Sequence, residues 1–137
     1  MQMCSEDLIA AQIPASPEFI EELSNILLNA MGIVRSHEDL QTALEKTEKI
    51  KNERELSVRE RNRLYAAEAM LRCADLRKES RGAHYREDFP QTDDTYKGKT
   101  MAVYDAESGQ VKVGFEAAQS LYKNSQAVSR EGRQLQL

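Results

Sequence analysis

The sequence predicts a mainly α-helical protein: an antiparallel three-helix bundle followed by an irregular charged loop and a β-hairpin. Three observations support this prediction. Serine caps precede three stretches in which apolar residues recur at helical spacing. The connections between these stretches are short, which favours antiparallel neighbours. After Gly82 the helical period stops, and apolar residues alternate as in strands from Met101 onward.

The composition limits the classes of protein that this chain can represent. Its 137 residues are 40% apolar and 31% charged, which is enough for one domain and a tail. The net charge of −4 provides no basic footprint for nucleic acid. There is no Trp and only 6% aromatic residues, so we expect no aromatic-lined cofactor pocket built from this chain alone.

The first helix is expected between Ser16, its N-cap, and Gly32, which ends it. Pro17 suits the first helical position. The residues that would face the bundle share helical spacing and are Phe19, Ile20, Leu23, Ile26, Leu27, Ala30 and Met31.

The second helix follows Ser36, with Asp39 in the place where a capping box usually has Glu. One face repeats with helical spacing and consists of Leu40, Ala43, Leu44, Thr47 and Ile50. The opposite face carries charges of both signs, which is typical of a solvated helix surface.

The third helix begins with Ser57 and Glu60, an S-x-x-E capping box. Its apolar stripe consists of Leu64, Ala67, Leu71 and Ala74, widened by Met70 and Cys73. We expect this helix to extend to about Ser80, where Gly82 stops it.

These patterns divide the chain into four parts. Residues 1–15 form a lead-in, residues 16–82 the bundle, residues 83–116 the charged loop and hairpin, and residues 117–137 a polar tail. The hairpin has apolar residues Met101–Phe115 on both sides of a loop that contains Gly109. Because a lone hairpin is marginal in water, we expect it to pack on the bundle. A short helix is expected through Ala117, Ala118, Leu121 and Tyr122.

The sequence contains no motif that would build a catalytic, cofactor-binding or metal site. No two glycines have the spacing of a nucleotide-binding loop, and Cys4 and Cys73 lack metal-ligand spacing. His37 is expected to be an exposed residue at a helix start. No apolar run is long enough to cross a bilayer, and Glu6 and Asp7 stand where a signal peptide would be basic. These features predict a cytoplasmic protein without direct membrane insertion.

One segment, residues 77–94, has an unusual density of charge. The dipole at the end of the third helix explains Arg77, Lys78 and Arg81. It does not explain the charges further along the loop, Arg86, Asp88, Asp93 and Asp94, which could form an Arg–carboxylate network. From the residues alone, three readings stay open: a structural loop, an interface, or an active site in which His84 and Asp88 form an acid–base pair.

The run E-S-R-G-A-H-x-R-x-D-F-P-x-x-D-D at positions 79–94 resembles the signature near the C-terminus of succinate dehydrogenase and fumarate reductase flavoprotein subunits, and of L-aspartate oxidase. Gly32-Ile33-Val34-Arg35 resembles that family's lead into its second helix. The resemblance covers roughly residues 17–116. It departs at Thr95-Tyr96-Lys97-Gly98-Lys99, where succinate dehydrogenases usually have a W-x-x-H-like segment, so the branch stays open.

The resemblance implies a spectrin-repeat-like bundle that packs against an FAD-binding domain. It places the motif at or near the interface between these two domains. The motif residues with a docking role would be Glu79, Ser80, Arg81, Gly82, His84, Arg86, Asp88, Asp93 and Asp94. FAD and the catalytic residues would belong to the parent oxidoreductase. An iron–sulfur subunit would be a further partner in electron transport and could bring the protein to a membrane. This chain alone would be inactive. The alternative is a free-standing helical interaction module.

Overall fold

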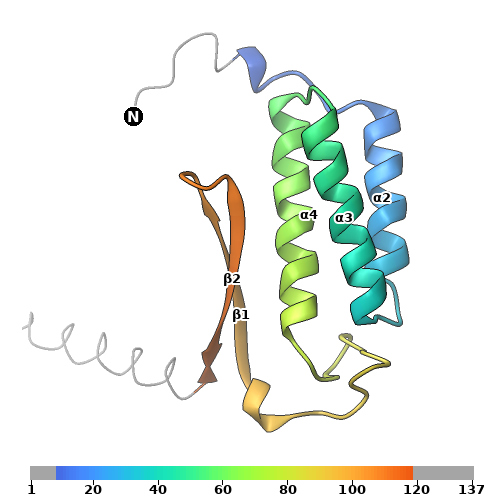
Figure 1. The fold of residues 1–137 in the computed structure, drawn as a ribbon, viewed down its shortest axis with the longest axis vertical. Helices are drawn as coiled ribbons and strands as arrows, with labels where there is room; N and C mark the ends of the chain where they lie inside the picture. Colours follow the sequence, from blue (N-terminus) through green and yellow to red (C-terminus); the bar gives the residue numbers. More distant parts are fainter. Residues whose placement is uncertain (1–8, 119–137) are drawn as a thin grey trace, which may run out of the picture.

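The computed structural model describes residues 9–118, and it confirms the predicted fold class. Three helices lie side by side, α2 (Pro17–Met31), α3 (His37–Glu53) and α4 (Val58–Leu76), and α3 runs opposite to the other two (Figure 1). A loop with one short 3-10 helix, η1 (Asp94–Tyr96), leads to the hairpin of β1 (Gly98–Asp105) and β2 (Gln110–Ala117). Within residues 9–118, no helix combines the length and hydropathy that crossing a bilayer requires.

Each helix begins at the serine that the sequence predicts. The hydroxyls of Ser16, Ser36 and Ser57 each accept a hydrogen bond from the backbone N–H three residues later. Only Ser57 and Glu60 form the full reciprocal capping box. The Glu60 carboxylate also accepts from the Ser16 N–H at 3.0 Å, so one side chain joins the starts of α2 and α4.

The core of the bundle is formed by the apolar faces of the three helices. Its buried members are Phe19, Leu23, Ile26, Ala30, Leu40, Ala43, Ile50, Leu64, Ala67, Leu71 and Ala74. The stripe predicted on the third helix is therefore confirmed. Met70 is an exception, since half of its surface is exposed. One residue turns a helix by about 100°, which moves position 70 away from the face that holds Leu71.

The hairpin covers the side of α4 that the other helices leave free, as Figure 1 shows. Val111 is buried there, and the centroid of the Tyr104 ring lies 4.4 Å from the centroid of the Tyr65 ring on α4. α4 is therefore flanked by both the bundle and the hairpin.

The two strands are longer than their apolar residues suggested. They pair in antiparallel register, from Gly98 opposite Ala117 to Asp105 opposite Gln110. Gly109 has a φ of +66°, which favours glycine at the tight loop. Because Tyr104 pairs with Val111, the neighbouring Val103 points to the opposite, exposed face.

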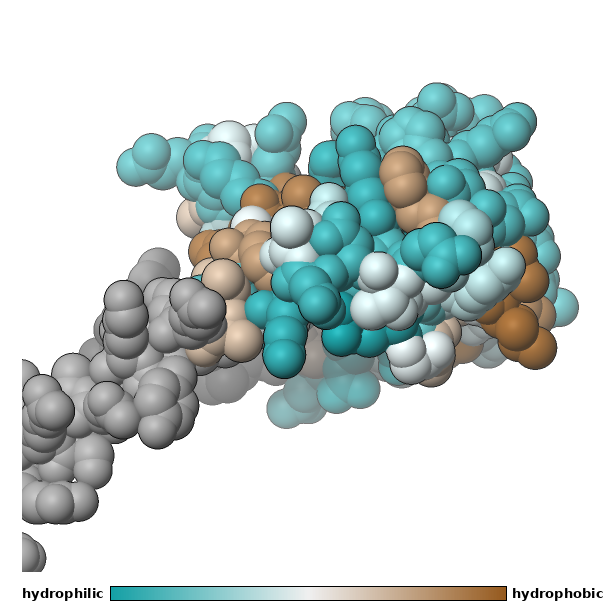
Figure 2. Space-filling view, turned by 90° about the horizontal axis from the view of Figure 1, so that it is seen from below, coloured by the Kyte–Doolittle hydropathy of each residue, from teal (hydrophilic) through white to brown (hydrophobic). Residues whose placement is uncertain are grey.

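Two expected boundaries differ from the structure. The third helix ends at Leu76 rather than near Ser80, because the chain turns there into the charged loop. Ala117 belongs to β2 rather than to a following helix, and the remaining tail from residue 119 lies outside the described residues. Seen from the loop end, the bundle surface is mostly hydrophilic with separate apolar areas (Figure 2).

Candidate functional site

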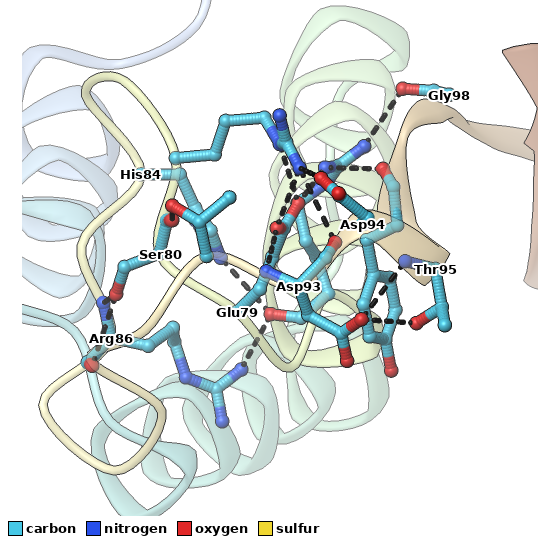
Figure 3. Close-up of polar contacts among 12 residues, drawn as sticks. Glu79, Ser80, His84, Arg86, Asp93, Asp94, Thr95 and Gly98 are labelled. Atoms are coloured by element: carbon cyan, nitrogen blue, oxygen red, sulfur yellow. Dashed lines mark hydrogen bonds and ion pairs between the residues drawn. The ribbon is translucent and has the colours of Figure 1, made fainter.

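The charged loop lies across the end of the bundle where α2 and α4 finish (Figure 1). Its most unusual feature is that two ionisable side chains, Glu79 and Arg86, are completely buried. Burying a charge is costly unless it is paired and hydrogen-bonded. The partners of these two residues therefore explain how the loop is built, and Figure 3 shows part of the network.

Arg86 closes the C-terminal end of α4. Its Nη1 donates to the carbonyl oxygens of Ala74 and Asp75 at 2.9 and 3.1 Å. These carbonyls belong to the last helical turn, and carbonyls at that position have no hydrogen-bond donor within the helix. A guanidinium at this position satisfies them and also complements the negative end of the helix dipole. This capping is the physical reason why the helix ends before Ser80.

Asp88 pairs with Arg86 and reaches a second helix. The Arg86 Nε and Nη2 donate to the two Asp88 carboxylate oxygens at 2.8 and 2.6 Å. Asp88 Oδ2 also accepts from the backbone N–H of His37, the first residue of α3, at 3.0 Å. The hydrogen bonds from Arg86 are the main reason why the pKa of Asp88 falls to about 2.

Ser80 holds the backbone of the loop together. Its hydroxyl accepts from the Arg86 N–H at 2.9 Å and donates to the Phe89 carbonyl at 2.8 Å. Its own N–H donates to the Gln91 carbonyl at 3.0 Å. A single buried serine thus fixes three points of the segment between residues 86 and 91.

Glu79 is the second buried charge, and its carboxylate receives several donors. Arg77 and Arg81 both donate to it, as does the backbone N–H of Asp93 at 2.9 Å. Burial raises the pKa of Glu79, but the hydrogen bonds from Arg81, the Asp93 N–H and Arg77 outweigh this effect. The pKa of Glu79 therefore lies below its usual value.

The helix dipole, which explains Arg77 in the sequence, accounts for only part of its role in the structure. Its Nη1 donates to the Tyr96 carbonyl at 3.0 Å and its Nη2 to the Gly98 carbonyl at 2.9 Å. Arg77 thereby connects the end of α4 to the start of β1. The sequence signal for this role was a basic residue two positions before Glu79.

His84 lies between two arginines from different segments. Its Nε2 is 3.0 Å from the Arg77 carbonyl, which can only accept, so Nε2 carries the proton. Its Nδ1 then accepts from the Arg35 Nη1 at 3.0 Å. Burial lowers the pKa of His84, and the charges of Arg35 and Arg86 lower it further. The imidazole is therefore neutral near pH 7.

Arg35 was not among the predicted site residues, although it stands in the lead into the second helix. Its N–H donates to the Tyr85 carbonyl, and its carbonyl accepts from the Glu87 N–H, both at 3.0 Å. The backbone segments around Arg35 and Arg86 therefore form an isolated parallel β-bridge. Sequence patterns could not reveal this pairing, because the two segments are 51 positions apart.

The remaining predicted residues occupy the turns and the outer side of the loop. Gly82 has a φ of +58° in a tight turn between Arg81 and His84. Asp93 caps η1 by accepting from the Thr95 N–H at 2.9 Å. The Asp94 side chain is 95% exposed and lies 3.8 Å from Arg81. His37 is exposed at the start of α3, as expected, and its Nδ1 lies 2.7 Å from Asp75.

The geometry gives no support to an acid–base pair of His84 and Asp88. Both nitrogens of His84 have other partners, and Asp88 is engaged by Arg86 and the α3 backbone. Within residues 9–118, no group of His, Cys, Asp and Glu side chains is placed to hold a metal ion. The arrangement can fix the shape of a loop, and its buried charges are satisfied internally.

These features define a helical domain whose charged residues close the bundle end and position an exposed loop. Residues 20–134 match the family model described as "Fumarate reductase flavoprotein C-term". The chain therefore belongs to this family.

Several curated proteins resemble part of the chain. It is 38% identical over 81 residues to an L-aspartate oxidase of Pyrococcus furiosus, covering 59% of this chain and 16% of that protein. It is 33% identical over 95 residues to one of the subunits of the fumarate reductase (CoM/CoB) of Methanothermobacter marburgensis, covering 58% of this chain and 17% of that protein.

Solved structures agree with this assignment. A variant of FrdA from E. coli quinol fumarate reductase has a TM-score of 0.60 and 27% identity, covering 73% of this chain and 20% of that chain. The Sdh1 complex of Mycobacterium smegmatis in the apo form has a TM-score of 0.62 and covers 80% of this chain and 22% of that chain. At 21% identity, the second comparison supports the fold alone. The chain spans less than a quarter of the length of these relatives.

Proposed function

We propose that this chain is the helical docking domain of an FAD-dependent oxidoreductase of the succinate dehydrogenase and fumarate reductase class. The domain would pack against the FAD-binding domain and would have no activity alone. The observation that carries the proposal is the internal pairing of the loop charges. Glu79, His84 and Arg86 are used to hold the loop, which leaves a structural role for the motif.

The FAD-binding domain is the partner that best fits a domain of this size and family. The relatives are several times longer than the region that matches, so the rest of their chains has room for a cofactor-binding domain. Inter-domain seams are commonly more polar than cores, which suits a loop rich in charge. An iron–sulfur subunit is a further proposed partner, and attachment to a membrane would depend on such partners.

The proposal leaves the branch of the family open, because the relatives include both L-aspartate oxidases and a fumarate reductase. The helical domain would not bind or select the substrate. We assign hydride transfer between FAD and a dicarboxylate substrate to the parts of the parent protein outside this domain.

An immunoblot of extract from the source cells, using an antibody raised against this chain, tests the proposal. A band several times larger than 15.6 kDa that co-elutes with flavin absorbance would support it. A band near 15.6 kDa without flavin would contradict it. In that case the chain would act as a free-standing interaction module.

A further inference from the structure

Three exposed apolar side chains lie beside the buried network. Ile33 is 89% exposed, Val34 47% and Tyr85 43%. They come from the α2–α3 link and from the charged loop, which are far apart in the sequence. The Arg35 N–H bond to the Tyr85 carbonyl brings the two segments together at 3.0 Å. We call Ile33, Val34 and Tyr85 the base patch.

The base patch is held in shape by groups behind it. His84 accepts from Arg35 on one side and donates to the Arg77 carbonyl on the other. Arg86, next to Tyr85 in the chain, is fully buried and anchored to the end of α4. A surface whose shape is fixed in advance loses little conformational entropy on binding, which is what a docking surface needs.

The neighbouring turn allows another backbone or side chain to approach closely. Gly82 and Ala83, which precede His84, are exposed and small. Arg35 and Arg86 turn inward to their partners, whereas the neighbouring Glu87 is exposed. The three side chains of the base patch are uncharged, so the surface that they contact should be apolar.

We infer that Ile33, Val34 and Tyr85 form the apolar anchor by which this domain docks on the FAD-binding domain. The inference rests on the proposed function and adds to it. The charged motif residues would shape the interface from behind, and the base patch would make the contact. The FAD-binding domain is the expected partner, because the matched relatives continue over more than three quarters of their length outside this domain. Apolar anchors at the centre of an interface supply much of its binding energy.

The test compares the isolated 137-residue chain with the assembly that carries it in source cells, using hydrogen–deuterium exchange. We expect the amides of residues 33, 34 and 85 to exchange at least about tenfold more slowly in the assembly. Residues 9–13 serve as an internal control. They precede α2, whereas the base patch follows its end, so a helix length of about 22 Å separates them. Equal exchange at the base patch in both samples would overturn the inference.

Two further measurements identify the occupant. A photo-cross-linking residue in place of Ile33 should attach to the flavin-binding domain; attachment to a second copy of this chain or to an iron–sulfur subunit would overturn the inference. Ile33→Glu should abolish the slowed exchange at residue 85, whereas Ile13→Glu, at an exposed control position, should not. Retained protection in Ile33→Glu would also count against the anchor. An assembly without flavin would instead refute the proposed function.

Discussion

The Arg86 guanidinium and the Asp88 carboxylate form a bidentate pair that joins the ends of two helices. Arg86 caps the last carbonyls of α4, and Asp88 accepts from the first N–H of α3. The positive partner thus lies at the negative end of one helix dipole, and the negative partner lies at the positive end of another. One ion pair locks the loop to two elements of the bundle.

Replacing Arg86 by Ala should strongly destabilise the domain. It would leave the α4 carbonyls and Asp88 without their buried donor, and breaking such a pair costs about 3–5 kcal/mol. Urea unfolding measures the loss. Arg86→Lys should recover only part of it, because an ammonium cannot make the bidentate contact. Arg63→Ala, at an exposed position on α4, is the control and should change stability by less than about 0.5 kcal/mol.

Leu71→Ala tests the core of the bundle. Leu71 is fully buried on α4, so its truncation should cost about 2–5 kcal/mol in the free energy of unfolding. Met70→Ala is a matched control one position away, where half of the side chain is exposed, and it should cost clearly less. A loss below about 0.5 kcal/mol for Leu71→Ala would mean that the α4 face is assigned incorrectly.

The Arg86–Asp88 pair should weaken in acid. The pKa of Asp88 is lowered from 3.8 to about 2, so the unfolded state binds protons more readily than the folded state. The stabilisation is therefore present above about pH 4 and is lost as the pH falls through 2. Unfolding measured over this range should show a shallower acid dependence in Asp88→Asn. An identical dependence in both proteins would show that Asp88 is not the responsible group.

His84 should make the domain sensitive to milder acid. Its pKa lies below 6.5 in the folded state, mainly because of burial, so protonation favours unfolding. The stabilisation that depends on neutral His84 should be fully present above about pH 6.5, and it should be lost as the pH falls toward and through the pKa of His84 in the folded state. Nitrogen NMR should find the proton on Nε2 at neutral pH. His84→Gln should remove this part of the pH dependence, and a proton observed on Nδ1 would contradict the hydrogen bonds assigned here.

The isolated chain should be colourless. The proposed function assigns FAD to a separate domain, so the purified 137-residue protein should show no flavin absorbance after incubation with FAD and gel filtration. The same treatment of the assembly from source cells serves as the positive control. A yellow isolated chain with stoichiometric flavin would place the cofactor site in this domain.

The sequence was a good guide wherever the relevant interactions are local. The caps at Ser16, Ser36 and Ser57 bond only three residues ahead, and the stripe containing Leu64 and Leu71 follows helical spacing. The loop motif was recognised by resemblance, and its Arg–carboxylate network was expected from charge density. Both the fold class and the family follow from such features.

What the sequence could not determine depends on contacts between distant segments. Arg35 and Arg77 were not predicted as parts of the site, because Arg35 meets His84, 49 positions away, and Arg77 reaches Gly98, 21 positions away. The end of α4 at Leu76 depends on Arg86 reaching back to its carbonyls.

The sequence by itself therefore determined the three helices of the bundle, their starts, most of the core and the family of this protein. Short-range hydrogen bonds and hydrophobic periodicity are sufficient for that. Only the tertiary structure decided which charges are buried, which tautomer His84 adopts and which apolar residues remain exposed at the base. Those properties depend on which segments meet in space and on how much water their contact excludes.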